Sequence, residues 1–256
     1  MGLNQHIVPG YAVFLRTWNS AFRRPVHFTF SLVQPLMWLL LFGFMFRQTM
    51  GGISGQQEDY LRFLFPGVCV MTLLFGASQS GISLIRDMQS GYLHRIFRSP
   101  IHPLAFTLGK LMADNLRFLL QALILFFIGW SVSEGDVNVL ALPACAAVWL
   151  LFGLSYASLS NMIALKARTQ ELMATFVHVF NMPLLFTSTI FIPHKAMPAW
   201  LEAIARWNPL SFAANFTRNV LLDADLPIYW QGGCVIISLL IACNFITCYT
   251  IQKLQP

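Results

Sequence analysis

Six apolar stretches, separated by short polar connections, dominate the hydrophobic pattern of this chain. A helix needs about 20 consecutive apolar residues to cross the hydrocarbon of a bilayer. The stretches that reach or approach this length are Pro25–Phe46, Phe63–Ile85, Phe118–Ser133, Val137–Leu165, Leu172–His194 and Leu226–Gln252. The third is long enough only if it extends back through Asp114 and Arg117. The pattern therefore predicts an all-α integral membrane protein with six transmembrane helices.

The composition supports this prediction and limits what else the chain contains. Charged residues make up 10% and apolar residues 57%, whereas soluble domains carry about 25% charged residues. Six spans leave about 100 residues outside the hydrocarbon, so we expect residues 1–256 to form a single transmembrane domain. The sequence contains no Gly-x4-Gly-Lys-Ser/Thr phosphate loop. We therefore expect no cofactor on this chain, and any ATP-driven activity would come from another polypeptide.

Charge and cysteine content exclude two other classes. The net charge of +6 does not predict nucleic-acid binding, because the basic residues are distributed by membrane side and do not form one stripe. Each of the five cysteines falls inside an apolar stretch, and none has Cys-x-x-Cys spacing. We interpret them as small buried apolar residues and expect no metal site.

The Lys/Arg bias predicts the orientation of the chain. If the N-terminus is inside, ten basic residues fall on inside segments and five on outside segments, with Arg117 at the membrane border. Lysine and arginine accumulate on the cytoplasmic side of membrane proteins. Both termini are therefore predicted to be cytoplasmic.

Residues 1–24 are predicted to form a cytoplasmic interfacial helix. Its aromatic and apolar residues recur at helical spacing, with basic residues on other faces: Tyr11, Phe14, Leu15, Trp18 and Phe22. Such a helix lies in the membrane surface with its aromatic face in lipid. It either anchors the N-terminus or contributes to a partner contact, and the pattern leaves both open.

The cytoplasmic loop of residues 86–110 contains a second short amphipathic helix. Leu93, Ile96 and Phe97 share one helical face, and Pro100 and Pro103 then stop the helix. A short helix held between two membrane helices suits docking to a cytoplasmic partner. An interfacial connector is the alternative.

Two further segments depart from simple spans. Asp114 and Arg117 form an i,i+3 pair at the start of the third span, which we interpret as an ion pair on the helix surface, with gating or substrate contact as the alternative. Residues 193–225 are too apolar for a free loop, and their prolines leave pieces too short to span. We predict short re-entrant or interfacial helices there, on the outer side.

These segments together resemble the permease subunits of ABC-2 type ABC transporters, the exporters that include the daunorubicin-resistance permeases. Four stretches of sequence carry the resemblance, which covers essentially the whole chain: the N-terminus running into Arg23-Arg24-Pro25; Asp87-Met-Gln-Ser-Gly91-Tyr-Leu93; Arg98-Ser-Pro100 to Leu108-Gly109-Lys110; and Phe191-Ile-Pro193 through Pro198-Ala-Trp200 to Asn208-Pro209-Leu210, ending at Arg218. The family pattern usually has a carboxylate two residues before the loop glycine. This chain has Gln89 there, with Asp87 as the nearby acidic residue.

The resemblance implies a fold, partners and a coupling site. Each subunit would have six helices and pair with an identical or related permease chain to form the export path. Two copies of a separate ATP-binding subunit, which hold the ATP and Mg²⁺, would dock on the cytoplasmic face of a bacterial inner membrane. The residues that would couple to the ATPase are Asp87, Gly91, Leu93, Ile96, Phe97 and Pro100.

In this interpretation the chain exports a hydrophobic or amphipathic drug or lipid-like substrate and carries out no catalysis. Faces of the first, second and fifth spans would line the path, with these candidate residues: Gln34, Phe75, Gln79, His178, Asn181 and Phe186. A histidine such as His178 on an apolar helix is more often a hydrogen-bonded packing residue than a proton or ligand site.

Other functions fit less well. Export of a lipid-linked polysaccharide is the alternative within the same class. An intramembrane enzyme would need an HExxH or GxSxG motif or paired aspartates, and the sequence has none of these. A channel would show charged rings or a filter loop, which are absent. An ion-driven secondary transporter typically has repeats and helix breaks near the midplane, whereas the breaks here fall near the outer surface.

Overall fold

The computed structural model describes residues 4–22, 25–50, 60–97, 103–132 and 137–253, which contain helices and no strand. Ten α-helices occur within these ranges: α1 (Asn4–Phe22), α2 (Pro25–Met50), α3 (Tyr60–Gln89), α4 (Tyr92–Phe97), α5 (Pro103–Val132), α6 (Leu142–Ala167), α7 (Gln170–Phe186), α8 (Ala199–Trp207), α9 (Pro209–Leu222) and α10 (Trp230–Lys253). Two 3₁₀ turns, η1 (Val139–Ala141) and η2 (His194–Ala196), precede α6 and α8. The all-α prediction is confirmed for the described residues.

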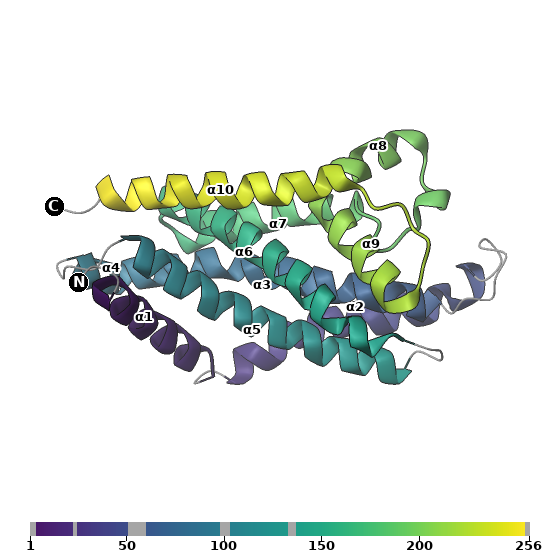
Figure 1. Ribbon diagram of the computed structural model, residues 1–256, viewed down its shortest axis with the longest axis horizontal. Coiled ribbons are helices and arrows are strands. Elements are labelled where there is room, and N and C mark those ends of the chain that lie inside the picture. The colour runs from purple at the N-terminus through teal and green to yellow at the C-terminus, as the bar shows by residue number, and fades with distance from the viewer. Residues whose placement is uncertain (1–3, 23–24, 51–59, 98–102, 133–136, 254–256) are drawn as a thin grey trace.

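The helices form one elongated bundle (Figure 1). The long helices run lengthwise, and both chain termini lie at the same end together with α4. We call this the terminal end, and the opposite end, which carries α8 and α9, the distal end. The arrangement gives the molecule two chemically different ends separated by apolar helices.

Within the part of the chain that the structure describes, four helical segments are long and apolar enough to cross a bilayer: Tyr60–Gln89, Ala105–Val132, Val139–Ala167 and Trp230–Thr247. The segment Leu32–Met45 of α2 is a shorter apolar helix among the described residues. α7 has only 17 residues. The membrane character of the fold is therefore clear, whereas the count of six spans stays a prediction.

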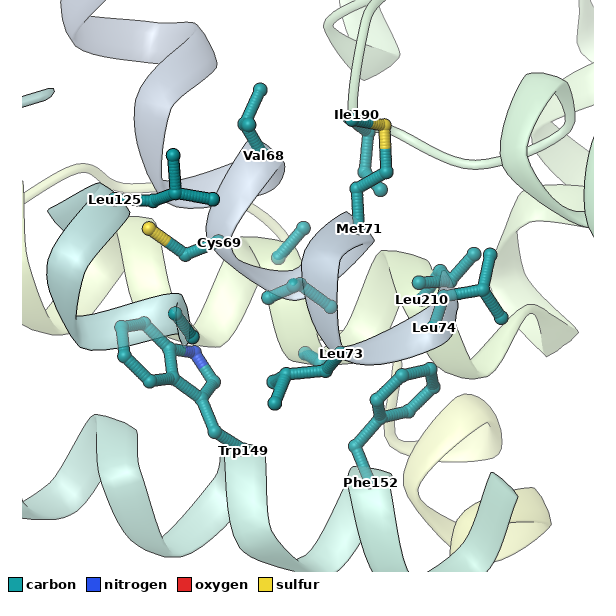
Figure 2. Close-up of a cluster of buried hydrophobic side chains, with 14 of the residues drawn as sticks. Val68, Cys69, Met71, Leu73, Leu74, Leu125, Trp149, Phe152, Ile190 and Leu210 are labelled. Atoms are coloured by element: carbon teal, nitrogen blue, oxygen red, sulfur yellow. The ribbon is translucent and has the colours of Figure 1, made fainter. Parts of the chain in front are cut away.

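α3 forms the centre of the bundle, since most of its residues are buried. Figure 2 shows its apolar side chains surrounded by residues of α5, α6, α9 and the segment after α7; the labelled neighbours are Leu125, Trp149, Phe152, Leu210 and Ile190. Lipid is as apolar as these side chains, so close packing rather than exclusion of water holds such helices together. Small residues allow this closeness: a Cβ on Gly109 of α5 would collide with the Gly10 carbonyl of α1.

The fifth predicted span is the clearest difference from the sequence prediction. The apolar run Leu172–His194 is not one helix, because α7 ends at Phe186. Thr187 and Ser188 then donate their hydroxyls to the carbonyls of Pro183 and Leu185, at 2.8 and 2.6 Å. These hydroxyls bind carbonyl groups at the end of the helix. Those carbonyls therefore need no water molecule as a partner where the helix ends.

Arg218 of α9 holds the irregular segment that follows. Its guanidinium is fully buried and donates to the carbonyls of Phe63, Thr189 and Ile190 at 2.9, 2.9 and 2.8 Å. It also lies 3.8 Å above the Phe63 ring. Gly67 leaves room for this side chain, since a Cβ there would come within 2.8 Å of Nη2. Arg218 thus joins α3, α9 and the segment after α7.

The segment 193–225 contains the two short helices that the prolines predicted, α8 and α9. Asn208 separates them, accepting a hydrogen bond from the Leu210 amide and donating to the Leu184 carbonyl, at 2.9 and 2.7 Å. α9 is largely buried, whereas α8 exposes Trp200 and Trp207. Their position relative to the membrane stays a prediction, as it does for α1.

Replacing Arg218 with Met should destabilise the fold strongly. The change leaves three buried carbonyls without this donor, and each buried unsatisfied group costs about 1–3 kcal/mol. We expect the free energy of unfolding in mixed micelles to fall by about 3 kcal/mol or more. Arg206→Met is the matched control, because Arg206 is exposed and pairs only with Glu202 at 2.9 Å among the described residues. Equal effects of the two changes would contradict the role assigned to Arg218.

Candidate functional site

The apolar face of α4 is turned towards the bundle. Leu93 and Ile96 are buried in a cluster at the terminal end with residues of five other helices: Val13, Leu84, Ile85, Phe106, Ala164, Leu165, Met173 and Val177. We call this set the terminal cluster. The side chain of Phe97 and the whole of Pro100 lie outside the described residues. Leu93 and Ile96 therefore fix α4 to its own chain, and a partner would meet other side chains of this helix.

A tight turn joins α4 to α3. Gly91 has a φ of 69°, a left-handed conformation that glycine adopts without strain. Its amide donates to the Met88 carbonyl at 3.1 Å, and its carbonyl accepts from the Arg95 amide at 3.2 Å. No neighbouring atom would hinder a Cβ at this position. The turn itself therefore explains the glycine.

Asp87 forms an ion pair that joins two helices. Its Oδ1 lies 3.1 Å from Nη2 of Arg16 in α1. The Arg16 guanidinium carbon lies 3.2 Å from the centre of the Tyr92 ring in α4. Burial raises the pKa of the Tyr92 phenol, and the Arg16 charge opposes that shift. Asp87, Arg16 and Tyr92 thus tie α1, α3 and α4 together.

The surface left open at the terminal end is polar and mainly basic. Arg86 of α3 and Arg95 of α4 are exposed, as are Lys166 in the last turn of α6 and Arg168 at its C-terminal end. Gln170 donates its amide to the Gln89 side chain at 2.9 Å, which places the start of α7 beside the turn before α4. This surface is the part of α4 and its neighbours that a soluble partner could contact.

A buried ion pair lies directly behind the terminal cluster. Lys110 Nζ of α5 is 2.7 Å from Asp114 Oδ2, and the two side chains are 2% and 3% exposed. Ser80 of α3 donates to the same Oδ2 at 2.6 Å, and Lys110 donates to Ser83 Oγ at 2.5 Å. The hydrogen bonds of this pair are formed within α5 or with α3.

The structure confirms the predicted ion pair between Asp114 and Arg117 and adds Lys110 as a closer partner. Arg117 Nη2 lies 3.9 Å from Asp114 Oδ1, a distance at which the charges attract without forming a hydrogen bond. The sequence places Lys110 at the end of the cytoplasmic loop, whereas in the structure α5 starts at Pro103 and includes it. The flexible four-carbon stem of lysine reaches the carboxylate one turn away.

Further hydrogen bonds extend this site to α6. Asn161 Oδ1 of α6 is 3.2 Å from Ser80 Oγ. Ser160 accepts from the Gly81 amide at 3.0 Å and donates to the Ser78 carbonyl at 2.8 Å. We call Ser80, Ser83, Lys110, Asp114 and Asn161 the buried polar network. It links α3, α5 and α6.

The sequence analysis missed most of these residues. Polar side chains within membrane helices are rare and tend to face the bundle interior. Ser80, Ser83 and Asn161 carry that signal, because each interrupts a long apolar run. What the sequence did not reveal is which of them meet in space.

The candidate path residues differ in exposure. Gln34, Gln79, His178 and Phe186 are exposed, and Phe75 is half-buried. Asn181 is fully buried and accepts from the Tyr156 hydroxyl at 2.6 Å while donating to Ser78 Oγ at 2.8 Å. The first group lies on open helix faces, whereas Asn181 packs inside the bundle. Their part in a path stays a prediction.

Within the described ranges, no group of three His, Cys, Asp or Glu residues could hold a metal ion.

Comparison with known proteins decides the family. Residues 10–222 match the model of the family described as ABC-2 type transporter. The chain belongs to the ABC-2 type transporter family. It is 30% identical over 257 residues to the transport permease ycf38 of Porphyra purpurea, covering 94% of this chain and 85% of that protein.

Two bacterial relatives carry names that refer to drugs. The permease is 29% identical over 229 residues to the daunorubicin resistance ABC transporter permease protein DrrB1 of Streptomyces coeruleorubidus, with 88% of this chain and 79% of the relative covered. It is 29% identical over 177 residues to the multidrug ABC transporter permease YbhR of Escherichia coli K12, with 68% of this chain and 48% of the relative covered. The family match includes α4 and the buried polar network. The protein is an integral membrane transporter permease.

Breaking the ion pair on one side should destabilise the permease more than removing both charges. Asp114→Leu leaves Lys110 buried with only serine partners, and an unpaired buried charge costs about 3–5 kcal/mol. Adding Lys110→Met removes that charge, and apolar replacements of buried pairs are often neutral. Denaturant unfolding in micelles should therefore show the double variant to be more stable than Asp114→Leu alone. The reverse order would contradict the geometry described here.

Proposed function

We propose that this permease is the membrane-spanning subunit of an ATP-driven exporter. The observation that carries the proposal is the family match over residues 10–222, because permeases of this family normally work with an ATP-binding subunit. We propose two copies of that separate subunit and a second permease chain, identical or related, which completes the export path. ATP and Mg²⁺ would bind to the partner, and this chain would carry out no bond-breaking chemistry of its own.

The terminal end is the proposed docking surface for the ATP-binding subunit. α4 and its turn at Gly91 lie there, as the coupling role of this segment requires, with Asp87, Leu93 and Ile96 shaping it from within. Arg95 and Arg86 are the exposed side chains beside it. Cycling of ATP would shift α4, and the permease would pass between states of different substrate affinity.

We propose a topology of six spans with both termini in the cytoplasm, in a bacterial inner membrane. The Lys/Arg bias supports the orientation, and the position of both termini at one end of the bundle agrees with an even number of crossings. The Streptomyces and Escherichia relatives support the bacterial setting. α1 would lie in the inner interface, and α8 and α9 would lie at the outer side.

The proposed substrate is a hydrophobic or amphipathic drug or lipid-like molecule. The names of two relatives refer to daunorubicin resistance and to multidrug transport. Gln34 and Gln79 would face the path, since exposed amide side chains in apolar helices need a polar partner or water, and Phe186 would add an exposed apolar contact. Export of a lipid-linked polysaccharide is the alternative, and ion-driven transport ranks below both.

Gentle extraction of the tagged permease from its native membrane should recover a soluble subunit with a Walker A loop. The purified complex should hydrolyse ATP, and inside-out vesicles should accumulate daunorubicin, used as the probe, only when ATP is present. Recovery of the permease without an ATPase, even after cross-linking, would contradict ATP coupling. Accumulation driven by an ion gradient alone would favour the secondary-transporter alternative.

A charge reversal on the exposed side of α4 should weaken the docking contact. Arg95→Glu changes only an exposed side chain, so insertion and thermal stability should be unchanged, while recovery of the ATP-binding subunit and ATP-dependent accumulation should fall at least about fivefold. Arg206→Glu at the distal end is the control and should have no effect on recovery. If both variants recover the partner as well as the unaltered permease does, α4 is not the docking element.

Labelling of single cysteines tests the topology. Arg168 and Lys195 are exposed at opposite ends of the bundle. In a background in which the exposed Cys234 is serine, a membrane-impermeant maleimide added to intact cells should label Lys195→Cys and leave Arg168→Cys unlabelled. Labelling at 168 but not at 195 would reverse the proposed orientation.

A further inference from the structure

A gain in folding stability does not explain the ion pair in the buried polar network. Moving two charges out of water costs several kcal/mol for each ion, and this cost often equals or exceeds their attraction. A lysine and an aspartate, each at least 97% buried, could be replaced by apolar residues that pack equally well. A role in fixing the positions of the helices is the physical alternative.

The buried polar network lies one helical turn beyond the terminal cluster on three helices. Lys110 follows Phe106 by four residues in α5, and Ser80 precedes Leu84 by four in α3. Asn161 in α6 stands in the same relation to Leu165. Residues four apart lie on the same face of a helix. The two layers are therefore stacked, with the apolar layer next to α4 and the polar layer behind it.

The two layers differ in how they respond to a shift of helices. Each apolar contact is individually weak and has no preferred direction. The ion pair itself lies within α5, and the bonds that cross to α3 are those of Ser80 to Asp114 and of Lys110 to Ser83, at 2.6 and 2.5 Å. These bonds depend on distance and angle, so a shift of α5 along α3 would break them and leave the buried charges without their serine partners. The polar layer therefore makes α3 and α5 move together.

A second row of bonds continues from this layer towards α7. Ser78, two residues before Ser80 in α3, accepts from Asn181 of α7 at 2.8 Å, and its carbonyl accepts from Ser160 of α6 at 2.8 Å. Phe186, the last residue of α7, is exposed. Hydrogen bonds thus connect α3 and α6, which contact α4 through the terminal cluster, with α7, which carries the candidate path residue Phe186.

We propose that Lys110 and Asp114 are positioning residues for coupling. Their ion pair within α5 binds Ser80 and Ser83 of α3, and these bonds fix the register of the two helices, so that a displacement of α4 reaches α6 and α7 as a concerted movement. The proposal rests on the proposed ATP-driven function and adds to it the residues that carry the movement. Neither residue contacts ATP or substrate.

The test measures how ATP changes the reactivity of a cysteine at position 186 in the purified complex. Phe186→Cys is placed in a background in which Cys234 and Cys248 are serine, and labelling by a maleimide is timed with and without MgATP. In the otherwise unaltered complex we expect ATP to change the rate by about fivefold or more, the lower range of coupling between sites. Lys110→Met/Asp114→Leu should retain ATP hydrolysis and lose this ATP effect.

Two further variants separate positioning from packing. Glu202→Leu/Arg206→Met removes an exposed i,i+4 ion pair on α8 and should keep the ATP effect. Lys110→Asp/Asp114→Lys restores an ion pair with the two charges exchanged. The serine hydroxyls can either donate or accept, so they can bind the exchanged charges. This variant should regain the ATP effect. The reversed pair also serves as the test if the apolar variant fails to assemble.

The outcomes distinguish this proposal from the function on which it rests. An unchanged ATP effect in the apolar variant would show that the pair only fills space, and failure of the assembled reversed pair to regain the effect would also overturn the proposal. If the complex with an intact ion pair neither hydrolyses ATP nor shows an ATP effect, the proposed ATP-driven function fails instead.

Discussion

A polar group in hydrocarbon has no water to bind, and this constraint explains how both ends of the permease are built. Every buried donor and acceptor must find a partner within the protein. At the distal end the Arg218 guanidinium satisfies three backbone carbonyls of an irregular segment. Behind the terminal end Lys110 and Asp114 neutralise each other, with serine hydroxyls completing their bonds. Between them, apolar packing around α3 is joined by further hydrogen bonds, such as those of Asn115 to the Leu150 carbonyl and of Trp149 to Thr217, at 2.9 and 3.0 Å.

The same constraint relates the two ends to function. The Arg218 contacts allow short helices and irregular backbone to pack against the distal part of α3 and α7. We propose that the bonds of the ion pair to Ser80 and Ser83 hold α3 and α5 in register behind α4. The bundle thus combines apolar packing with directional contacts between its helices. This architecture agrees with membership of the ABC-2 type family.

The sequence predicted the elements far better than their contacts. Helical periodicity and prolines identified α1, α4, α8 and α9 before the structure was known, because local patterns determine local structure. The irregular segment after Phe186 was not predictable, because the carbonyls of Thr189 and Ile190 are bound by Arg218, which lies 29 and 28 residues later in the sequence. The orientation of α4 was also missed. An amphipathic helix has an apolar face, but the sequence does not say whether that face meets a partner or its own chain. Asp114 illustrates the same limit, since only the fold shows that Lys110 is its partner.

Site-specific photo-crosslinking is the most direct test of the central claim that an ATP-binding subunit docks at the terminal end. A photoreactive residue would be placed in turn at Arg95 on α4 and at Trp200 on α8, both exposed and at opposite ends. The account predicts that a subunit with a Walker A loop is captured from position 95 and not from position 200. Capture of that subunit from position 200, or from neither position while the complex is intact, would contradict it.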